Sequence, residues 1–298
     1  MEDYRRYLDP KTLNKVAGLE LKARLIVEGF VAGRHQSPLK GSSVEFREHR
    51  EYVPGDDTRF LDWKVYAKTD RFYIKEYEEE TSLKAYMVVD TSHSMSFASG
   101  DNVSKLEYAK FVAASLTHLI SQQQDAAALV LWDHELKKFL PPGNNPLHIR
   151  DIYRSLSEVK AQGKTDIGAL LADVAERLRQ RSLIILLSDL FDDDGGLDRG
   201  LKYVRHKGHD VICFHTLDPA ELTFPFDRMT RFEGLEVEDR LLADPKALKE
   251  AYLEELEAFI QNARSACMAN KMDYVQLDTS APLDIALSSY LAARAGAH

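Results

Sequence analysis

The chain has 298 residues, 44% hydrophobic and 29% charged, which is the composition of an ordinary globular protein with enough length for a full core. Acidic residues outnumber basic ones 48 to 39, and the net charge of −9 argues against nucleic acid as a partner, because phosphate binding needs a basic face. Two cysteines, Cys213 and Cys267, lack the spacing of a zinc site or a disulfide framework. The charged N-terminus lacks the apolar region of a signal peptide, and no apolar run is long enough to span a bilayer. These features predict a cytoplasmic protein with two buried, reduced thiols and no membrane span.

Residues 1–81 predict an N-terminal helix followed by a small layer of β or irregular structure. Asp9–Pro10 is a typical helix start. Apolar residues spaced four apart, namely Leu13, Ala17, Leu21 and Leu25, predict a helix that runs to about Phe30 and is ended by Gly33. Residues 34–81 are dense in charges and aromatic rings, with turn signals between short extended segments. We interpret this block as a packed structural layer. The alternative is a partner-binding surface, because Arg and Trp are common hot spots, and its candidate residues are Arg50, Arg59, Trp63 and Lys64.

From residue 82 onward, short apolar runs alternate with segments whose apolar residues have helical spacing. The run at 135–140 follows its neighbour after two residues, which predicts an antiparallel hairpin partner. The expected strands are 85–89, 126–132, 135–140, 183–187, 211–216 and 274–277. The expected helices are 103–120, 147–156, 167–178, 197–206, 245–270 and one opened by Pro282, with a hairpin within 218–243. The pattern predicts a doubly wound, mostly parallel sheet, covered by helices on both faces, over residues 82–298.

Polar side chains follow two of the expected strands. Asp90, Ser92 and Ser94 are spaced two apart directly after the first strand, and Asp189 follows the strand at 183–187. In such folds ligands bind at the carboxyl ends of the strands, so both loops are expected at one edge of the sheet. Thr165 is expected at a helix start, where its hydroxyl either caps the helix or reaches the same point. Carboxylate and hydroxyl oxygens are hard ligands that suit Mg²⁺, Mn²⁺ or Ca²⁺, so these five residues form a candidate metal site, with a polar turn as the alternative.

The spacing resembles a known site. Asp90-Thr91-Ser92-His93-Ser94, with Thr165 and Ser188-Asp189 downstream, is similar to the metal-ion-dependent adhesion site of von Willebrand factor type A domains. The resemblance implies that Ser92 and Ser94 bind the ion directly. It also implies that Asp90 and Asp189 supply charge, directly or through water, and that Thr165 joins in one state of the site. An open coordination position would then accept an acidic side chain from a protein partner. Many type A domains have glycine after the last aspartate, where this chain has Leu190.

The block before the sheet resembles the signature of a bacterial family of uncharacterised proteins with a type A domain, often encoded beside MoxR-type AAA+ ATPases. The matching positions are Gly33, His35, Gly41, Ser43, Glu45, Phe46, Arg50, Tyr52, Gly55, Asp56, Asp57, Arg59, Asp62, Trp63 and Ala67. The segment LDPAE at 217–221 and the C-terminal PLDIALSSYLAARA also look like family features. The resemblance implies a metal-dependent protein-interaction module, rather than an enzyme, that works with such an ATPase in remodelling or maturing other proteins.

An Mg²⁺-dependent hydrolase is the competing hypothesis. Phosphatases of the haloacid dehalogenase type also place an aspartate after their first strand. That chemistry needs a second aspartate two residues on, as general acid, and this chain has Ser92 there.

Overall fold

The computed structural model describes residues 9–15, 17–33, 46–52, 63, 65–66, 71–77, 83–191, 195–227, 230–233, 240–243 and 245–295. The chain divides into two compact units, one of residues 1–37 with 83–298 and one of residues 38–82. In the smaller unit, β1 (Phe46–Glu51) and β2 (Tyr73–Tyr77) pair antiparallel, which confirms extended segments in this block. Several positions of the predicted family signature lie outside the described residues: His35, Gly41, Ser43, Glu45, Gly55, Asp56, Asp57, Arg59, Asp62 and Ala67, together with the candidate contact residue Lys64.

The expected N-terminal helix is two helices. In α1 (Pro10–Asn14) the Asp9 carboxylate accepts hydrogen bonds from the first backbone N–H groups, so the predicted cap is confirmed. The second helix, α2 (Leu19–Gly33), starts after Gly18. Gly18 has a φ of +81°, a left-handed backbone conformation that glycine adopts at little energetic cost. The prediction of one continuous helix to Phe30 is therefore wrong, because the leucine spacing runs across a glycine that breaks the backbone regularity.

A six-stranded sheet is the centre of the larger unit. Its strands are β3 (Lys84–Asp90), β4 (Ala126–Trp132), β5 (Leu136–Gly143), β6 (Leu183–Ser188), β7 (Asp210–Leu217) and β10 (Asp273–Asp278). The order is β10-β7-β6-β3-β4-β5, and every neighbouring pair is parallel except β4 with β5. The antiparallel β5 is an edge strand that carries two prolines, Pro141 and Pro142. The predicted fold class, a doubly wound, mostly parallel sheet with one antiparallel strand, is confirmed.

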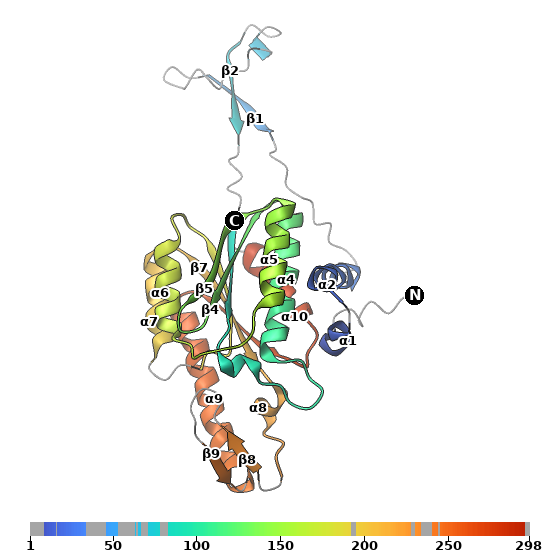
Figure 1. Cartoon of the computed structure of the whole chain (residues 1–298). Helices are drawn as coiled ribbons and strands as arrows, with labels where there is room; N and C mark the ends of the chain where they lie inside the picture. Colours follow the sequence, from blue (N-terminus) through green and yellow to red (C-terminus); the bar gives the residue numbers. More distant parts are fainter. Residues whose placement is uncertain are drawn as a thin grey trace. The chain divides into compact units, whose positions relative to one another are not determined.

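Helices cover both faces of this sheet (Figure 1). The elements on one face include α4 (Lys105–Gln122), α5 (Pro146–Glu158) and α10 (Asp284–Ala295). Those on the opposite face are α6 (Ile167–Arg177), α7 (Gly196–His206) and the end of α9 (Pro245–Ala269) that carries Cys267. Successive strand residues alternate between the two cores: Met87 and Val89 lie in the first, and Tyr86 and Val88 in the second. Burial on both faces explains why these strands read as continuous apolar runs.

Three short elements and a hairpin complete the larger unit. They are the 3-10 helix η3 (His93–Ser96), α8 (Pro219–Thr223), and the antiparallel strands β8 (Thr230–Glu233) and β9 (Arg240–Ala243). The hairpin expected within 218–243 is thus confirmed. Helix α8 was not predicted, because Pro219 reads as a chain breaker, although proline suits the first turn of a helix. Cys213 and Cys267 are buried free thiols in the second core, as the sequence indicated.

Candidate functional site

The candidate site lies where the strand order reverses. After β3 the chain passes to β4 on one side and later returns to β6 on the other side of β3. Val89 pairs with Leu187, so Asp90 and Ser188, the last residues of the two strands, end side by side. In open parallel sheets, ligands bind outside the carboxyl ends of the strands at such a reversal point.

Asp90 is fully buried and is held by three hydrogen bonds. Its Oδ1 accepts from the Ser92 backbone N–H at 2.9 Å and from the Thr165 hydroxyl at 2.6 Å. Its Oδ2 accepts from the Ser188 hydroxyl at 2.6 Å. Among the described residues, no lysine, arginine or histidine forms an ion pair with this carboxylate. Burial, and then the negative charge of Asp189, raise the pKa of Asp90 to about 6, although the three hydrogen bonds act in the other direction.

The hydroxyls of Ser92 and Ser94 lie beside each other in the loop that follows Asp90. Their Oγ atoms are 3.0 Å apart and share a hydrogen bond. Two neighbouring ligands of an octahedral Mg²⁺, each about 2.1 Å from the ion, would also stand about 3.0 Å apart. Ser92 is buried, whereas Ser94 and Thr165 are half-buried. The residues present therefore fit a hard cation that is anchored on the buried side and open to solvent on the other.

The Thr165 hydroxyl is available to bond Asp90, because Asp166 and not Thr165 caps the following helix. Helix α6 is capped by Asp166, whose carboxylate accepts a hydrogen bond from the Ala169 N–H at 2.8 Å. This leaves the Thr165 hydroxyl to bond Asp90 across 75 positions of sequence. Of the two roles left open by the sequence, helix cap or site residue, the geometry supports the second.

Asp189 directly follows Ser188, which bonds Asp90, and its charge acts on Asp90, but its own carboxylate makes a different contact. Its Oδ2 lies 2.7 Å from the ammonium of Lys105, in a pair whose side chains are both almost completely buried. Within the described chain it makes no hydrogen bond to Asp90, Ser92, Ser94 or Thr165. The structure thus brings four of the five predicted residues into direct or shared hydrogen bonding, and places the fifth in a neighbouring ion pair.

Two charged residues beside the site, Lys105 and Glu221, were not predicted from the sequence. Glu221 Oε1 accepts from Lys105 at 2.7 Å, and its Oε2 accepts from the Asp218 backbone N–H at 2.7 Å. Two signals were available. Lys105 directly follows Ser104, which caps α4, and a cation is disfavoured at a helix N-terminus. Glu221 belongs to the segment LDPAE, where Asp218 and Glu221 form a capping box at the start of α8.

Leu190 stands where many type A domains carry glycine after the last aspartate, and the structure shows how leucine is tolerated there. Its φ is +58°, a left-handed conformation that glycine adopts freely and leucine rarely does. The side chain is buried in the second core, and its N–H donates to the Ser188 hydroxyl at 2.9 Å. Burial of the leucine side chain thus offsets the backbone strain.

The candidate site depends on hydroxyl oxygens as well as carboxylates. In the described part of the chain, no three His, Cys, Asp or Glu side chains gather as a metal-binding group. A cation would therefore take up Ser92, Ser94 and Thr165 oxygens beside the aspartates. Neutral hydroxyls leave a bound cation electron-poor, which suits the capture of a further carboxylate.

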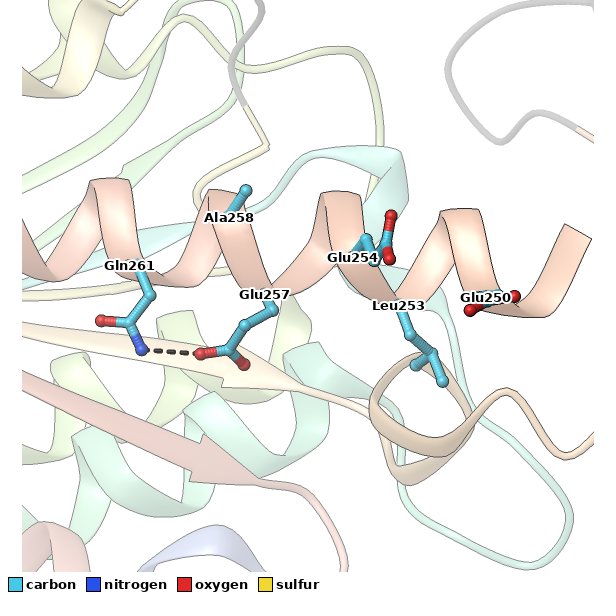
Figure 2. A pocket seen from close by; sticks show the side chains of 6 residues that line it. All are labelled: Glu250, Leu253, Glu254, Glu257, Ala258 and Gln261. Atoms are coloured by element: carbon cyan, nitrogen blue, oxygen red, sulfur yellow. Dashed lines mark hydrogen bonds between the residues drawn. The ribbon is translucent and has the colours of Figure 1, made fainter.

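A surface hollow lies elsewhere, on the exposed side of α9 (Figure 2). It is lined by Glu250, Leu253, Glu254, Glu257, Ala258 and Gln261. Glu257 accepts a hydrogen bond from Gln261 at 2.6 Å. None of the five predicted site residues lines it, so this hollow and the candidate site are separate features.

The profile of the family described as "Protein of unknown function DUF58" matches residues 48–259. The chain belongs to the DUF58 family. The match takes in β3 to β7 and most of α9, so all five candidate site residues lie inside the DUF58 region.

Known proteins similar to this DUF58 chain include two uncharacterised bacterial ones. Rv1480 of Mycobacterium tuberculosis is 25% identical over 220 residues, which cover 73% of this chain and 68% of that protein. YeaD of Bacillus subtilis is 25% identical over 198 residues, which cover 61% of this chain and 47% of that protein.

Solved structures similar to this chain have low sequence identity. The conserved hypothetical protein BatB of Bacteroides thetaiotaomicron aligns with a TM-score of 0.48 at 18% identity, covering 72% of this chain and 99% of that one. The SpRpn10 VWA domain aligns with a TM-score of 0.39 at 15% identity, covering 70% of this chain and 95% of that one. Across the described residues, no helix combines the length and the apolar character that crossing a membrane requires.

Proposed function

We propose that this DUF58 protein is a metal-dependent protein-interaction module. The ion is Mg²⁺, or alternatively Mn²⁺ or Ca²⁺, held by Ser92 and Ser94 with Asp90, Asp189 and Thr165. A free coordination position accepts an acidic side chain of a partner protein. The partner is a MoxR-type AAA+ ATPase or its client, and the module acts as an adaptor in protein remodelling or maturation. The ATPase is inferred from the sequence resemblance of residues 33–67 and 217–221.

The observation that carries the metal proposal is the state of Asp90. A buried carboxylate normally has a cationic partner, because an unpaired buried charge is costly. Asp90 is fully buried and has hydrogen bonds only from neutral groups among the described residues. The loop that follows it carries two hydroxyls, Ser92 and Ser94, at the spacing of adjacent octahedral ligands. A divalent cation at the hydroxyls would supply the missing positive charge.

Metal binding is tested by titrating the full chain with MgCl₂ in a calorimeter after treatment with a chelator. Wild type is expected to bind one Mg²⁺, and Ser92→Ala is expected to lose at least about tenfold in affinity, because a directly bound ligand is removed. Ser96→Ala is the matched control: Ser96 lies on the same 3-10 helix, but its hydroxyl donates to the His93 carbonyl and is exposed. Absence of Mg²⁺, Mn²⁺ and Ca²⁺ binding by wild type contradicts the proposal.

The partner is tested by pull-down with the cognate MoxR-type ATPase. Capture is expected in Mg²⁺, and is expected to fall sharply with chelator or with Ser92→Ala but not with Ser96→Ala. Capture that is equal in all four conditions would rule out a metal-bridged contact. Capture that is absent throughout, with Mg²⁺ binding intact, would rule out this ATPase as the direct partner.

Nothing in the described structure favours the hydrolase alternative. The residue two positions after Asp90 is Ser92, a buried hydroxyl, where that chemistry needs a carboxyl group as general acid.

A further inference from the structure

Lys105 occupies a position where a cation is unfavourable. It is the first residue of α4, directly after the Ser104 cap, where the exposed N–H groups of the helix carry partial positive charge. Its side chain is only 1% exposed. A buried lysine at a helix N-terminus persists only if nearby anions more than offset both penalties.

Two carboxylates provide that compensation. Asp189 Oδ2 and Glu221 Oε1 each lie 2.7 Å from the Lys105 ammonium. The rings of Phe191 and Phe97 lie 5.0 Å and 5.9 Å from it, so aromatic faces complete the enclosure. The ammonium is thus sealed between two acids and two rings, and one of the two acids is a candidate metal ligand.

The Asp189 carboxylate could therefore pair with either of two cations, a divalent ion or the Lys105 ammonium. A divalent ion at Ser92 and Ser94 attracts the Asp189 carboxylate, either directly or through water. The Lys105 ammonium holds the same carboxylate at 2.7 Å. It would also repel an incoming ion, since charges in a water-poor environment interact strongly. Glu221 weakens this repulsion, because its carboxylate also pairs with the Lys105 ammonium and partly neutralises its charge. A hydrogen bond from the Asp218 N–H holds the Glu221 carboxylate in place.

We propose that Lys105 is a resident counter-ion that competes with the divalent cation for Asp189 and so sets how tightly the candidate site holds metal. This inference rests on the proposed function, and it adds a specific determinant of metal affinity outside the five ligand residues. When metal draws Asp189 away, Lys105 keeps Glu221, so the lysine remains paired in both states.

Two substitutions are expected to change affinity in opposite directions. Lys105→Met keeps the length of the side chain but removes the competing charge, so Mg²⁺ is expected to bind about tenfold more tightly. Glu221→Gln leaves Lys105 dependent on Asp189 alone, so Mg²⁺ is expected to bind about tenfold more weakly. The amide introduced by Glu221→Gln retains an oxygen that can accept the hydrogen bond from the Asp218 N–H.

Lys110→Met is the matched control. Lys110 is also buried on α4, about 7.5 Å further along the helix axis, and its ammonium bonds Glu107 at 2.7 Å and the Val159 carbonyl at 2.9 Å. It is expected to lower the melting temperature in chelator, as Lys105→Met does, but to leave Mg²⁺ affinity unchanged.

The experiment is calorimetric titration of each full-length variant with MgCl₂, together with thermal melting in chelator and in saturating Mg²⁺. Lys105→Met is expected to melt lower than wild type in chelator and to gain more from Mg²⁺. Suppose that wild type binds Mg²⁺ but that neither variant changes the affinity, or that both change it in the same direction. Lys105 is then a purely structural residue, and the inference is wrong while the proposed function stands. If Lys105→Met does not fold, Glu221→Gln decides alone. If wild type binds no metal, both fail.

Discussion

The two aspartates of the candidate site differ in how the fold accommodates them. Asp90 is satisfied by three neutral donors and has a pKa raised to about 6. Asp189 is satisfied by a buried ammonium that it shares with Glu221. Both carboxylates are buried at adjacent strand ends. Ionisation of Asp90 lowers the stability of the fold, whereas the ionised Asp189 is needed to pair with Lys105. Substitution by asparagine should therefore have opposite effects on stability at the two positions.

The largest effect is expected at Asp189. Asp189→Asn removes one member of a buried ion pair and leaves Lys105 with Glu221 alone, so the free energy of unfolding in chelator is expected to fall by about 3 kcal/mol. Urea denaturation at pH 7 measures it. A loss below about 1 kcal/mol would mean that Glu221 alone suffices for Lys105.

The opposite sign is expected at Asp90. The pKa of Asp90 is raised from 3.8 to about 6 in the folded chain, so its ionisation favours the unfolded state. Stability in chelator should fall as pH rises from about 4 to 6 and then stay level. Asp90→Asn, which cannot ionise, should therefore be more stable than wild type by about 2 kcal/mol at pH 7, with the gain vanishing near pH 4. Denaturation curves at several pH values measure this, and a variant less stable than wild type at pH 7 would contradict it.

A smaller effect is expected at Thr165. Thr165→Val keeps the shape but removes the hydroxyl that donates to Asp90 at 2.6 Å, so stability in chelator at pH 7 should fall by about 1 kcal/mol. In a double-mutant cycle with Asp90→Asn, that loss should shrink, since the hydrogen bond is then to a neutral group. Equal losses in both backgrounds would show that the hydroxyl acts independently of the Asp90 charge.

The smallest effect is expected at a partly exposed acid, which serves as the reference for both buried ones. Asp173 pairs with Arg177 one helical turn later, and both side chains are a third or more exposed. Asp173→Asn should change the free energy of unfolding by less than about 0.5 kcal/mol in the same urea assay. A loss as large as that at Asp189 would mean that burial does not explain the difference between the acids.

The architecture was predictable because it depends on local periodicity. Strands such as β3 and β6 are buried on both faces and appear as short apolar runs, whereas α6 and α7 show one apolar stripe. The break between α1 and α2 at Gly18 was not predicted, because the spacing of apolar residues does not reveal a single residue with left-handed backbone conformation. Helix α8 was missed because its five residues are too few to show a period.

The site was predictable only in part, for a related reason. Asp90, Ser92 and Ser94 are close together in sequence, and Asp189 follows from the rule that ligands bind at strand ends. Thr165 was expected at a helix start, where its hydroxyl could either cap the helix or reach the site. The partner of Asp189 is 84 positions away at the start of a helix, and no local pattern reports which buried charges will meet. The identity of the ion and of the partner protein stays a prediction.

The prolines of β5 have a consequence for assembly. An unprotected sheet edge can recruit a strand from another molecule through its free N–H and C=O groups. Pro141 and Pro142 lack backbone N–H groups, so the half of β5 that contains them cannot offer a complete ladder to an incoming strand. Association by strand addition at this sheet should therefore be favoured along β10, on the opposite margin.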